Sequence, residues 1–352
     1  MPAAYFLLPG DPETKTGGYL YAKRIIAGLR SLGWMVNLQR LGSGFPRPDE
    51  RELNEARVLL AAIPSGSLII VDGLALGGMP ELVEAASSRL YCVALIHHPL
   101  ALETGLSPAE QTRLATQEKA ALATVQRVIV TSLTTAQMLQ SDYGVAPSRS
   151  SVVTPGTDPA PLARGSGSTQ RQLLCVASFT PRKAHAHLLD ALAGLRDRAW
   201  RLRCIGNMTL DPATTDAVRR QIARLDLADR VELIGQLAPE RLAAHYDQAD
   251  AFVLPSYLEG YGMALAEALA RGLPIVSTTG GAIPTTVPDT AGLLAPPGDV
   301  ASLRDALACI LDDTDRYHSL AQGARAARLA LPTWKQATER FAHELAETAH
   351  WS

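Results

Sequence analysis

Two glutamates eight residues apart, Glu259 and Glu267, flank a glycine-containing turn in the sequence PSYLEGYGMALAEALARG at residues 255–272. A carboxylate accepts hydrogen bonds from neighbouring hydroxyls, such as those of a sugar ring or a ribose. Residues 251–254 predict a strand before the turn, and residues 263–270 predict a helix after it. Backbone N–H groups at a helix start bind phosphate. The pattern therefore predicts a site for a diphosphate with a hydroxylated group at each end, which describes a sugar nucleotide.

Spacing alone leaves open a second interpretation, in which Glu267 is a solvated helix residue and Glu259 is a loop charge. The run EGYGMALAE, however, resembles the E-x7-E signature of retaining GT-B glycosyltransferases of family 4, the glycosyl transferases group 1. The resemblance extends over most of the chain, including AFVLPSYLEGYG, GLPIVSTTGG and a helix beginning near Trp334. It implies that Glu259 contacts the transferred sugar and that Glu267 holds the ribose. It also implies that four loop residues contact the sugar and the diphosphate: Gly260, Tyr261, Gly262 and Met263.

The composition favours a two-domain globular protein and excludes several partners. A chain of 352 residues is long for a single core. With 33 basic and 35 acidic residues and no basic run, nucleic acid is not an expected partner. The first residues, MPAAYFLLPGD, lack a basic region before a short apolar run, and no stretch of about 18 apolar residues occurs. We therefore expect neither export nor a membrane span, and a cytoplasmic location.

The four cysteines are far apart in the sequence, and three lie in apolar runs typical of strands. Buried free thiols fit this pattern better than disulfides or a metal site, and they indicate a reducing compartment. The cysteines are Cys92, Cys175, Cys204 and Cys309.

Apolar runs of strand length alternate with helical patterns, which is the rhythm of parallel sheets covered on both faces. Strands are expected within 4–8, 35–41, 67–73, 90–98, 127–132, 173–178, 201–207, 231–236, 251–256 and 274–279. The fold class is therefore α/β, with two Rossmann-like, doubly wound domains whose facing strand ends form a cleft for the active site.

The stretch TPGTDPAPLARGSGST is dense in proline, glycine and serine and predicts a linker. The predicted division is an acceptor-side domain at 1–155, a linker at 156–170, and a donor-side domain at 171–332. The resemblance implies a GT-B arrangement and a C-terminal helix, within 333–352, that returns to the first domain.

Gly17 and Gly18 lie at the entry to a helix, where the lack of side chains lets the backbone approach an anion. An ordinary helix entry explains the same pair. The resemblance implies that this loop covers the donor diphosphate.

Arg182 and Lys183 follow the first strand of the second domain. Fixed cations there would stabilise the charge that develops on a departing diphosphate, although a solvated basic loop is the alternative. Lys183 matches the lysine of the family in position. The arginine usual five residues earlier is Ser178 here, so we expect Arg182 to replace it.

His97 and His98 end a predicted strand of the first domain. The resemblance implies that His97 lies next to the transferred sugar, whereas His98 faces the acceptor or caps the strand. No acidic partner is evident for His97, so we do not assign it as a general base.

Three further features concern the donor and a metal. The resemblance implies that the backbone near Leu233, Ile234 and Gly235 reads the nucleobase edge. Thr285 stands where the family commonly has an acidic residue. No acidic triad of the kind that binds a divalent metal ends a strand, so neither a metal nor another cofactor is expected.

The resulting hypothesis is a retaining, metal-independent hexosyltransferase that uses a UDP- or GDP-linked sugar by front-face displacement. The acceptor hydroxyl is not identified; a soluble acceptor is favoured, and peripheral membrane contact is not supported. Two alternatives stay open: a sugar-nucleotide epimerase of the same fold, and a non-catalytic protein that binds nucleotide sugars.

Overall fold

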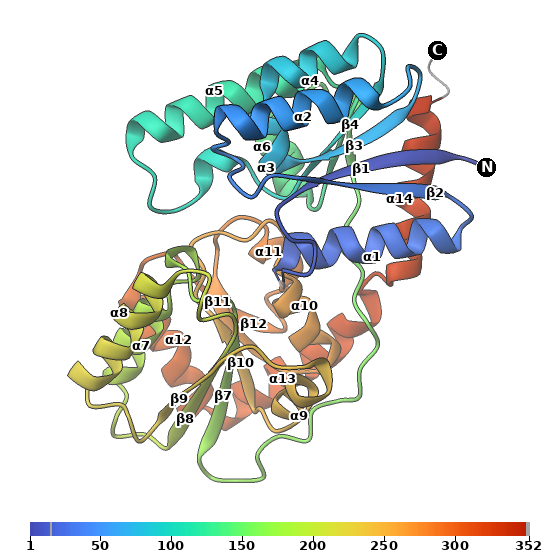
Figure 1. Cartoon of the computed structure of the whole chain (residues 1–352). Helices are drawn as coiled ribbons and strands as arrows, with labels where there is room; N and C mark the ends of the chain where they lie inside the picture. The colour runs from blue at the N-terminus through green and yellow to red at the C-terminus, as the bar shows by residue number, and fades with distance from the viewer. Residues whose placement is uncertain (15, 350–352) are drawn as a thin grey trace. The chain divides into compact units, whose positions relative to one another are not determined.

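The computed structural model describes residues 1–14 and 16–349, which form two compact α/β units (Figure 1). Unit 1 comprises the described residues of Met1–Gly156 and Pro332–Ser352, and unit 2 comprises Thr157–Leu331. Each unit contains one six-stranded sheet, and every strand pair in both sheets is parallel. The predicted class of two doubly wound parallel sheets is confirmed.

The sheet of unit 1 has the order β2-β1-β3-β4-β5-β6, so the direction of winding reverses between β1 and β3. Ligands of open parallel sheets bind at such a reversal, beyond the carboxyl ends of the strands. The strands are β1 Ala3–Pro9, β2 Met35–Leu41, β3 Leu68–Asp72, β4 Tyr91–Ile96, β5 Arg127–Val130 and β6 Ser150–Val152. The helices are α1 Gly17–Ser31, α2 Glu50–Ala62, α3 Gly73–Gly78, α4 Pro80–Ser87, α5 Pro108–Thr124, α6 Leu133–Ser141 and α14 Trp334–Ala349, with short 3-10 turns η1 Leu100–Leu102 and η2 Pro147–Arg149.

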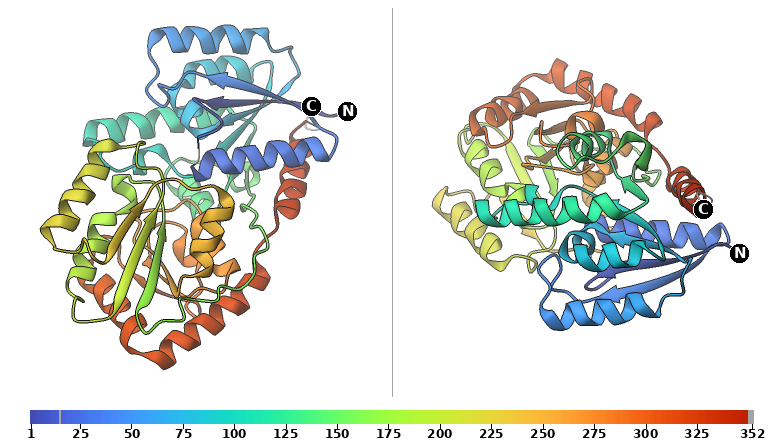
Figure 2. Two further views of the ribbon diagram at one scale, coloured as in Figure 1. Left: turned by 60° about the horizontal axis from the view of Figure 1, so that its bottom comes forward. Right: turned by 90° about the horizontal axis from the view of Figure 1, so that it is seen from above.

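Both faces of this sheet are buried, which explains why its strands are continuously apolar. Along β1, Phe6 and Leu8 pack into one cluster with residues of α1 and α14, whereas Leu7 packs into the opposite cluster with residues of α2. In both views of Figure 2 the strands at the N-terminal end of the chain lie between α1 and α2. A strand covered on both faces cannot alternate apolar and polar residues.

The sheet of unit 2 has the order β12-β11-β10-β7-β8-β9, which is the Rossmann order with its reversal between β7 and β10. The loops that follow β7 and β10 therefore lie side by side at the carboxyl edge. The strands are β7 Arg171–Val176, β8 Trp200–Ile205, β9 Val231–Ile234, β10 Ala251–Leu254, β11 Ile275–Thr278 and β12 Gly292–Ala295. The helices are α7 His185–Ala193, α8 Pro212–Arg224, α9 Pro239–Asp247, α10 Met263–Ala270, α11 Ile283–Thr286, α12 Val300–Asp312 and α13 Thr314–Ala327, with 3-10 turns η3 Pro181–Lys183 and η4 Arg328–Ala330.

The segment that we predicted as a linker is extended and bonded to unit 2, not separate from it. The Arg164 Nε donates to the Asp247 carboxylate at 2.8 Å, and the Ser166 hydroxyl donates to Asp250 at 2.7 Å. Unit 2 accordingly begins at Thr157, whereas the sequence placed the start of the second domain at 171. The side chains of Arg164 and of Ser166, which stands between two glycines, supply these bonds, so the composition of the segment alone did not reveal the attachment.

The C-terminal helix α14 packs on α1 within unit 1 (Figure 1). Phe341 is fully buried beside Tyr21, and a methyl group at Gly28 would lie 2.2 Å from the Thr338 hydroxyl oxygen. Glycine is therefore needed where the two helices cross. Among the described residues, no helix combines the length and the apolar character that crossing a membrane requires.

Candidate functional site

The predicted strand and helix around the two glutamates are confirmed as β10 and α10. Gly262 caps α10 with φ of 91°, and a methyl group there would approach the Leu265 side chain to 2.7 Å. A side chain at this position is disfavoured twice, by backbone conformation and by space. The glycine turn thus lets the chain leave β10, present Glu259, and enter the helix that carries Glu267.

Glu259 is buried, with 7% of its surface exposed, and it lies against both predicted cations. Its Oε1 accepts hydrogen bonds from the Lys183 Nζ and from the Ser256 hydroxyl, each at 2.5 Å. The Arg182 guanidinium lies 3.6 Å from the Glu259 Oε2. Two cations surround one carboxylate, so the cluster carries one net positive charge. Such a cluster is suited to an anionic ligand.

The charges of this cluster shift the pKa values of its members. Burial by itself would raise the pKa of the Glu259 carboxyl, but the charges of Lys183 and Arg182 and the hydrogen bonds from Lys183 and Ser256 outweigh it, so the pKa is lowered. The pKa of Lys183 is lowered too, because burial and the Arg182 charge outweigh the attraction of Glu259. The carboxylate is therefore held ionised by its neighbours.

Main-chain hydrogen bonds fix the turn that carries the two cations. The Arg182 carbonyl accepts from the Tyr257 amide at 2.8 Å, and the Arg182 guanidinium donates to the Leu258 carbonyl at 2.6 Å. The next residue after Lys183, Ala184, has φ of 52°, in the left-handed region that non-glycine residues seldom adopt. These bonds join the loops after β7 and β10, which the strand order brings together.

A second loop, after β11, supports Glu259 from its backbone. The Glu259 carbonyl accepts from the Ala282 amide at 2.8 Å, and the Thr278 hydroxyl donates to the Ser256 carbonyl at 2.5 Å. A methyl group on Gly281 would lie 2.4 Å from the Glu259 carbonyl oxygen, so the two loops touch closely. The run GLPIVSTTGG is part of the family resemblance, but the supporting roles of Ser256 and Thr278 were not predicted from the sequence. Thr278 ends β11 and Ser256 lies two residues after the end of β10, and these positions at the ends of buried strands were the available signal.

Glu267 lies in a different environment from Glu259. Its Oε2 accepts from the Tyr246 hydroxyl at 3.0 Å, and its carbonyl accepts from the Arg271 guanidinium at 2.9 Å. The Arg271 guanidinium also lies 4.3 Å from the centre of the Tyr246 ring. Burial, and then the Glu267 charge, raise the pKa of Tyr246. Glu267 is thus half-buried, and its carboxylate is oriented by Tyr246.

The remaining residues that we assigned to the donor lie on the same edge of unit 2. Ile234 ends β9, and a methyl group on Gly235 would meet only the Met208 sulfur, at 3.9 Å. The Tyr261 carbonyl accepts from the Thr286 hydroxyl at 2.6 Å, and burial raises the pKa of Tyr261 to about 12. Gly260 and Met263 are half-buried, whereas Thr285, which stands in an acidic position of the family, is exposed.

In unit 1, the structure brings Gly18 and His97 together. Gly17 and Gly18 begin α1, and a methyl group on Gly18 would lie 3.3 Å from the His97 ring. The His97 Nε2 is 3.7 Å from the Asp72 Oδ2, and Asp72 is only 3% exposed. No acidic partner for His97 was evident from the sequence, whereas the structure places the Asp72 carboxylate near its ring, beyond hydrogen-bond distance. Asp72 ends β3 and His97 follows β4, so these sequence-distant side chains meet at adjacent strand ends.

The two neighbouring histidines have different partners. The His98 Nε2 lies 3.1 Å from the Glu103 Oε2, whereas the His97 ring packs edge-on against Tyr21 with centroids 5.5 Å apart. Residues 17, 18, 97 and 98 belong to unit 1, and all other predicted site residues belong to unit 2. In unit 1 the glycines follow β1 and the histidines follow β4. In unit 2 the two cations follow β7 and Glu259 follows β10, whereas Ile234 and Gly235 lie at the end of the edge strand β9.

Comparison with known proteins connects this site to a family. The family profile described as Glycosyl transferases group 1 matches residues 162–327, which contain all the unit 2 site residues. The chain is 28% identical over 308 residues to an MMP alpha-(1->4)-mannosyltransferase of Mycolicibacterium hassiacum, covering 83% of this chain and 73% of that protein. It is 32% identical over 239 residues to a D-inositol 3-phosphate glycosyltransferase of Nocardia farcinica, covering 63% of this chain and 52% of that protein. The chain thus matches about half the length of this second relative.

Solved structures extend the likeness of fold to the whole chain. The sucrose-phosphate synthase of Thermosynechococcus elongatus matches with a TM-score of 0.84 and 22% identity over 100% of both chains. Anabaena HepE in complex with UDP-glucose matches with a TM-score of 0.78 and 19% identity, over 98% of this chain and 99% of that one. Both likenesses establish the GT-B fold.

Proposed function

We propose that the chain transfers a hexose from a UDP- or GDP-linked sugar to an acceptor hydroxyl with retention of configuration. It belongs to the glycosyl transferases group 1 family, whose members are glycosyltransferases that use nucleotide-sugar donors. The observation that carries this proposal is the buried cluster of Glu259, Lys183 and Arg182 at the strand reversal of unit 2. A Rossmann-type sheet binds nucleotides at this point.

The charges of the cluster suit the departure of a nucleoside diphosphate. Breaking the bond between the sugar and the phosphate leaves negative charge on the phosphate oxygens. Lys183 and Arg182 are fixed by hydrogen bonds before any ligand binds, so they stabilise that charge without reorganising. The nearby Glu259 carboxylate would then accept hydrogen bonds from hydroxyls of the transferred sugar, in place of the bond from Ser256.

We assign Glu267 to the ribose and the backbone of Ile234 and Gly235 to the base. The Glu267 carboxylate is already oriented by the Tyr246 hydroxyl, so it loses little conformational entropy when it accepts hydrogen bonds from the vicinal hydroxyls of a ribose. The first helical turn of α10, with Gly260, Tyr261, Gly262 and Met263 before and within it, would bind the diphosphate through backbone N–H groups.

In unit 1 we assign Gly17, Gly18 and His97 to the ligand, with His98 on the acceptor side. His97 would donate to the transferred sugar or hold its position through Asp72. In the proposed front-face step, the leaving phosphate oxygen removes the proton from the acceptor hydroxyl as the anomeric carbon gains positive charge. No protein nucleophile and no metal ion take part in this step.

A donor screen followed by a transfer assay tests the proposal. UDP, GDP, ADP and their sugars are first compared by thermal shift, and UDP-glucose is included because the HepE structure holds it. The preferred sugar nucleotide is then offered to a panel of hydroxyl acceptors that includes D-inositol 3-phosphate, which the name of one relative suggests.

Transfer to any acceptor with the anomeric configuration of the donor, seen by proton NMR, is the expected result. Inversion at the anomeric carbon would contradict the retaining mechanism. Isomerisation of the donor without acceptor would instead indicate an epimerase, and binding without any conversion would indicate a binding protein.

A further inference from the structure

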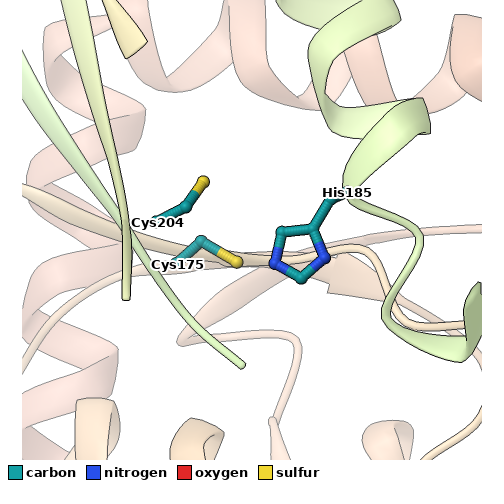
Figure 3. A group of neighbouring side chains, drawn as sticks. All are labelled: Cys175, His185 and Cys204. Atoms are coloured by element: carbon teal, nitrogen blue, oxygen red, sulfur yellow. The ribbon is translucent and has the colours of Figure 1, made fainter. Parts of the chain in front are cut away.

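Three side chains in unit 2 form a compact buried cluster outside the proposed donor site. Cys175 lies on β7, Cys204 on β8 and His185 at the first position of α7. One atom from each side chain lies within 4.8 Å of the other two. Their exposed fractions are 0%, 2% and 2% respectively. Figure 3 shows the imidazole of His185 directed at the Cys175 sulfur, with Cys204 next to it.

The fold builds this cluster from two independent features. Cys175 and Cys204 are register partners on adjacent parallel strands, so their side chains leave the same face of the sheet. His185 reaches that face because Ala184, with φ of 52°, turns the chain into α7. The ring of His185 then stacks on Phe179, with centroids 4.4 Å apart and planes 8° from parallel. The imidazole is held rigidly beside the thiols.

The imidazole is also an unexplained buried polar group. Neither the Nδ1 nor the Nε2 of His185 has a hydrogen-bond partner within residues 1–14 and 16–349. Buried polar groups in native proteins are almost always satisfied, so a ring without a hydrogen bond that lies beside two thiols requires an explanation. A ligand bound by the ring and both sulfurs supplies one.

We propose that Cys175, His185 and Cys204 bind one thiophilic metal ion, with Zn²⁺ favoured. Thiolate and imidazole ligands select zinc or copper(I) over harder cations. Two thiolates and a neutral imidazole carry two negative charges, so Zn²⁺ leaves the buried site electrically neutral, whereas copper(I) would leave it anionic. Burial of all three residues shields the ion from bulk solvent, so we assign it a structural role, with the three side chains supplying three of the four positions that Zn²⁺ usually fills.

A disulfide between the two cysteines accounts for the cluster less well. Such a bond would consume both sulfurs and leave the His185 nitrogens without partners. All four cysteines are free thiols in the structure. The sequence suggested buried thiols with no common site, and only the register of β7 and β8 brings Cys175 and Cys204 together.

The site has a mechanical consequence for the donor loop. His185 is two residues after Lys183, and the η3 turn at Pro181–Lys183 joins β7 to α7. An ion bound to residues on both sides of this turn would fix its ends, much as a disulfide does. Removing the ion would loosen the turn that holds Lys183 against Glu259.

Metal analysis of untagged protein, expressed in zinc-supplemented medium and purified without chelators, tests the proposal. One equivalent of zinc or copper by mass spectrometry is expected, and loading with Co²⁺ should produce thiolate-to-cobalt charge-transfer absorption. Because the site is closed, loading is carried out by refolding with the metal present. The apparent melting temperature should fall when the protein is refolded with a chelator instead.

Variants identify the ligands. His185→Gln, close in size to histidine, and Cys175→Ser should each lose the bound metal and the cobalt absorption. His187→Ala, on the same helix, and Cys309→Ser should keep both. Folding of each variant is checked by circular dichroism, and the cobalt spectrum of refolded wild type gives a result that does not depend on any variant. The proposal would be overturned if wild-type protein refolded with zinc, copper or cobalt contained none of these metals. It would also be overturned if the protein mass were lower by two hydrogens because Cys175 and Cys204 form a disulfide.

Discussion

The pairing of Lys183 with Glu259 predicts a large energetic coupling between the two residues. Lys183→Met keeps the approximate length of the side chain but removes its charge. The Glu259 carboxylate, which is only 8% exposed, would then keep two partners: the Ser256 hydroxyl and the Arg182 guanidinium at 3.6 Å. Breaking a buried ion pair from one side costs about 3–5 kcal/mol. Because Lys183 is 17% exposed and Arg182 remains, we expect a loss near the lower limit, about 3 kcal/mol.

A double-mutant cycle separates this pair from its surroundings. Glu259→Gln alone removes the carboxylate and leaves two adjacent cations, so it also destabilises unit 2. The double variant loses both charges and should cost less than the sum of the single variants, by about 1.5–3 kcal/mol. Urea unfolding is followed by the fluorescence of Trp200, the single tryptophan of unit 2, with the other tryptophans of the chain replaced by phenylalanine.

An exposed ion pair provides the control for the cycle. Lys23 and Glu13 are 2.7 Å apart, but their side chains are 57% and 72% exposed, so Lys23→Met with Glu13→Gln should show a coupling below about 1 kcal/mol. A coupling between Lys183 and Glu259 that is equally small would refute the view of a buried pair. If the proposed reaction holds, Lys183→Met should also lower kcat on the order of 10²–10³-fold.

The direction of the Glu259 pKa shift adds a pH dependence to the same comparison. A carboxyl whose pKa is lowered by folding stabilises the protein above its unfolded pKa, about 4.3, and that stabilisation disappears as pH falls through the lower folded pKa. The stability difference between wild type and Glu259→Gln should therefore be constant near neutral pH and shrink below about pH 4.3. A difference that grows on acidification would contradict the assigned direction.

Two other sites give independent predictions. Glu267→Gln should weaken binding of the preferred nucleotide about tenfold, which is about 1.4 kcal/mol, as measured by isothermal titration calorimetry. Glu240→Gln, at an exposed position of α9, is the control. Equal affinities of the two variants would contradict the assignment of Glu267 to the ribose. Gly262→Ala should destabilise unit 2 in chemical unfolding by about 2–3 kcal/mol, because a φ of 91° costs about 1–2 kcal/mol and the methyl group meets Leu265. Gly33→Ala, with φ of 84° and no atom within 4 Å of the added methyl group, should show the conformational cost alone. An equal loss of stability in both variants would show that the Leu265 side chain moves aside without cost.

The sequence predicted most strands of both sheets and missed two, β6 and β12. β6 at Ser150–Val152 and β12 at Gly292–Ala295 both lie at sheet edges. Each has a single neighbouring strand, with which it pairs in parallel, and the local sequence does not show this pairing. By contrast, β10 and α10 have an apolar strand, a glycine turn and a glycine stop, so their bounds followed from local chemistry.

Side-chain partners were the least predictable part of the candidate site. Glu259 and Lys183 are 76 positions apart, and only the strand order, with β7 beside β10, shows that their loops meet. The pairing of Asp72 with His97 has the same origin, because β3 and β4 are adjacent in the sheet of unit 1. Periodicity and turn chemistry describe each element separately, and they contain no information on which strand ends become neighbours.

The strand reversal also provides a structural basis for our proposal that Arg182 replaces the family arginine, whose position is Ser178 here. The family arginine would precede the lysine by five residues, whereas Arg182 is adjacent to Lys183 on the η3 turn. This turn accepts from the Tyr257 amide and donates to the Leu258 carbonyl, both in the loop after β10. The guanidinium is thereby held 3.6 Å from Glu259 by a loop far away in the sequence. The proposal that Arg182 acts as a second cation beside Lys183 therefore rests on the contact between the two loops, which holds its guanidinium near Glu259 from a different backbone position.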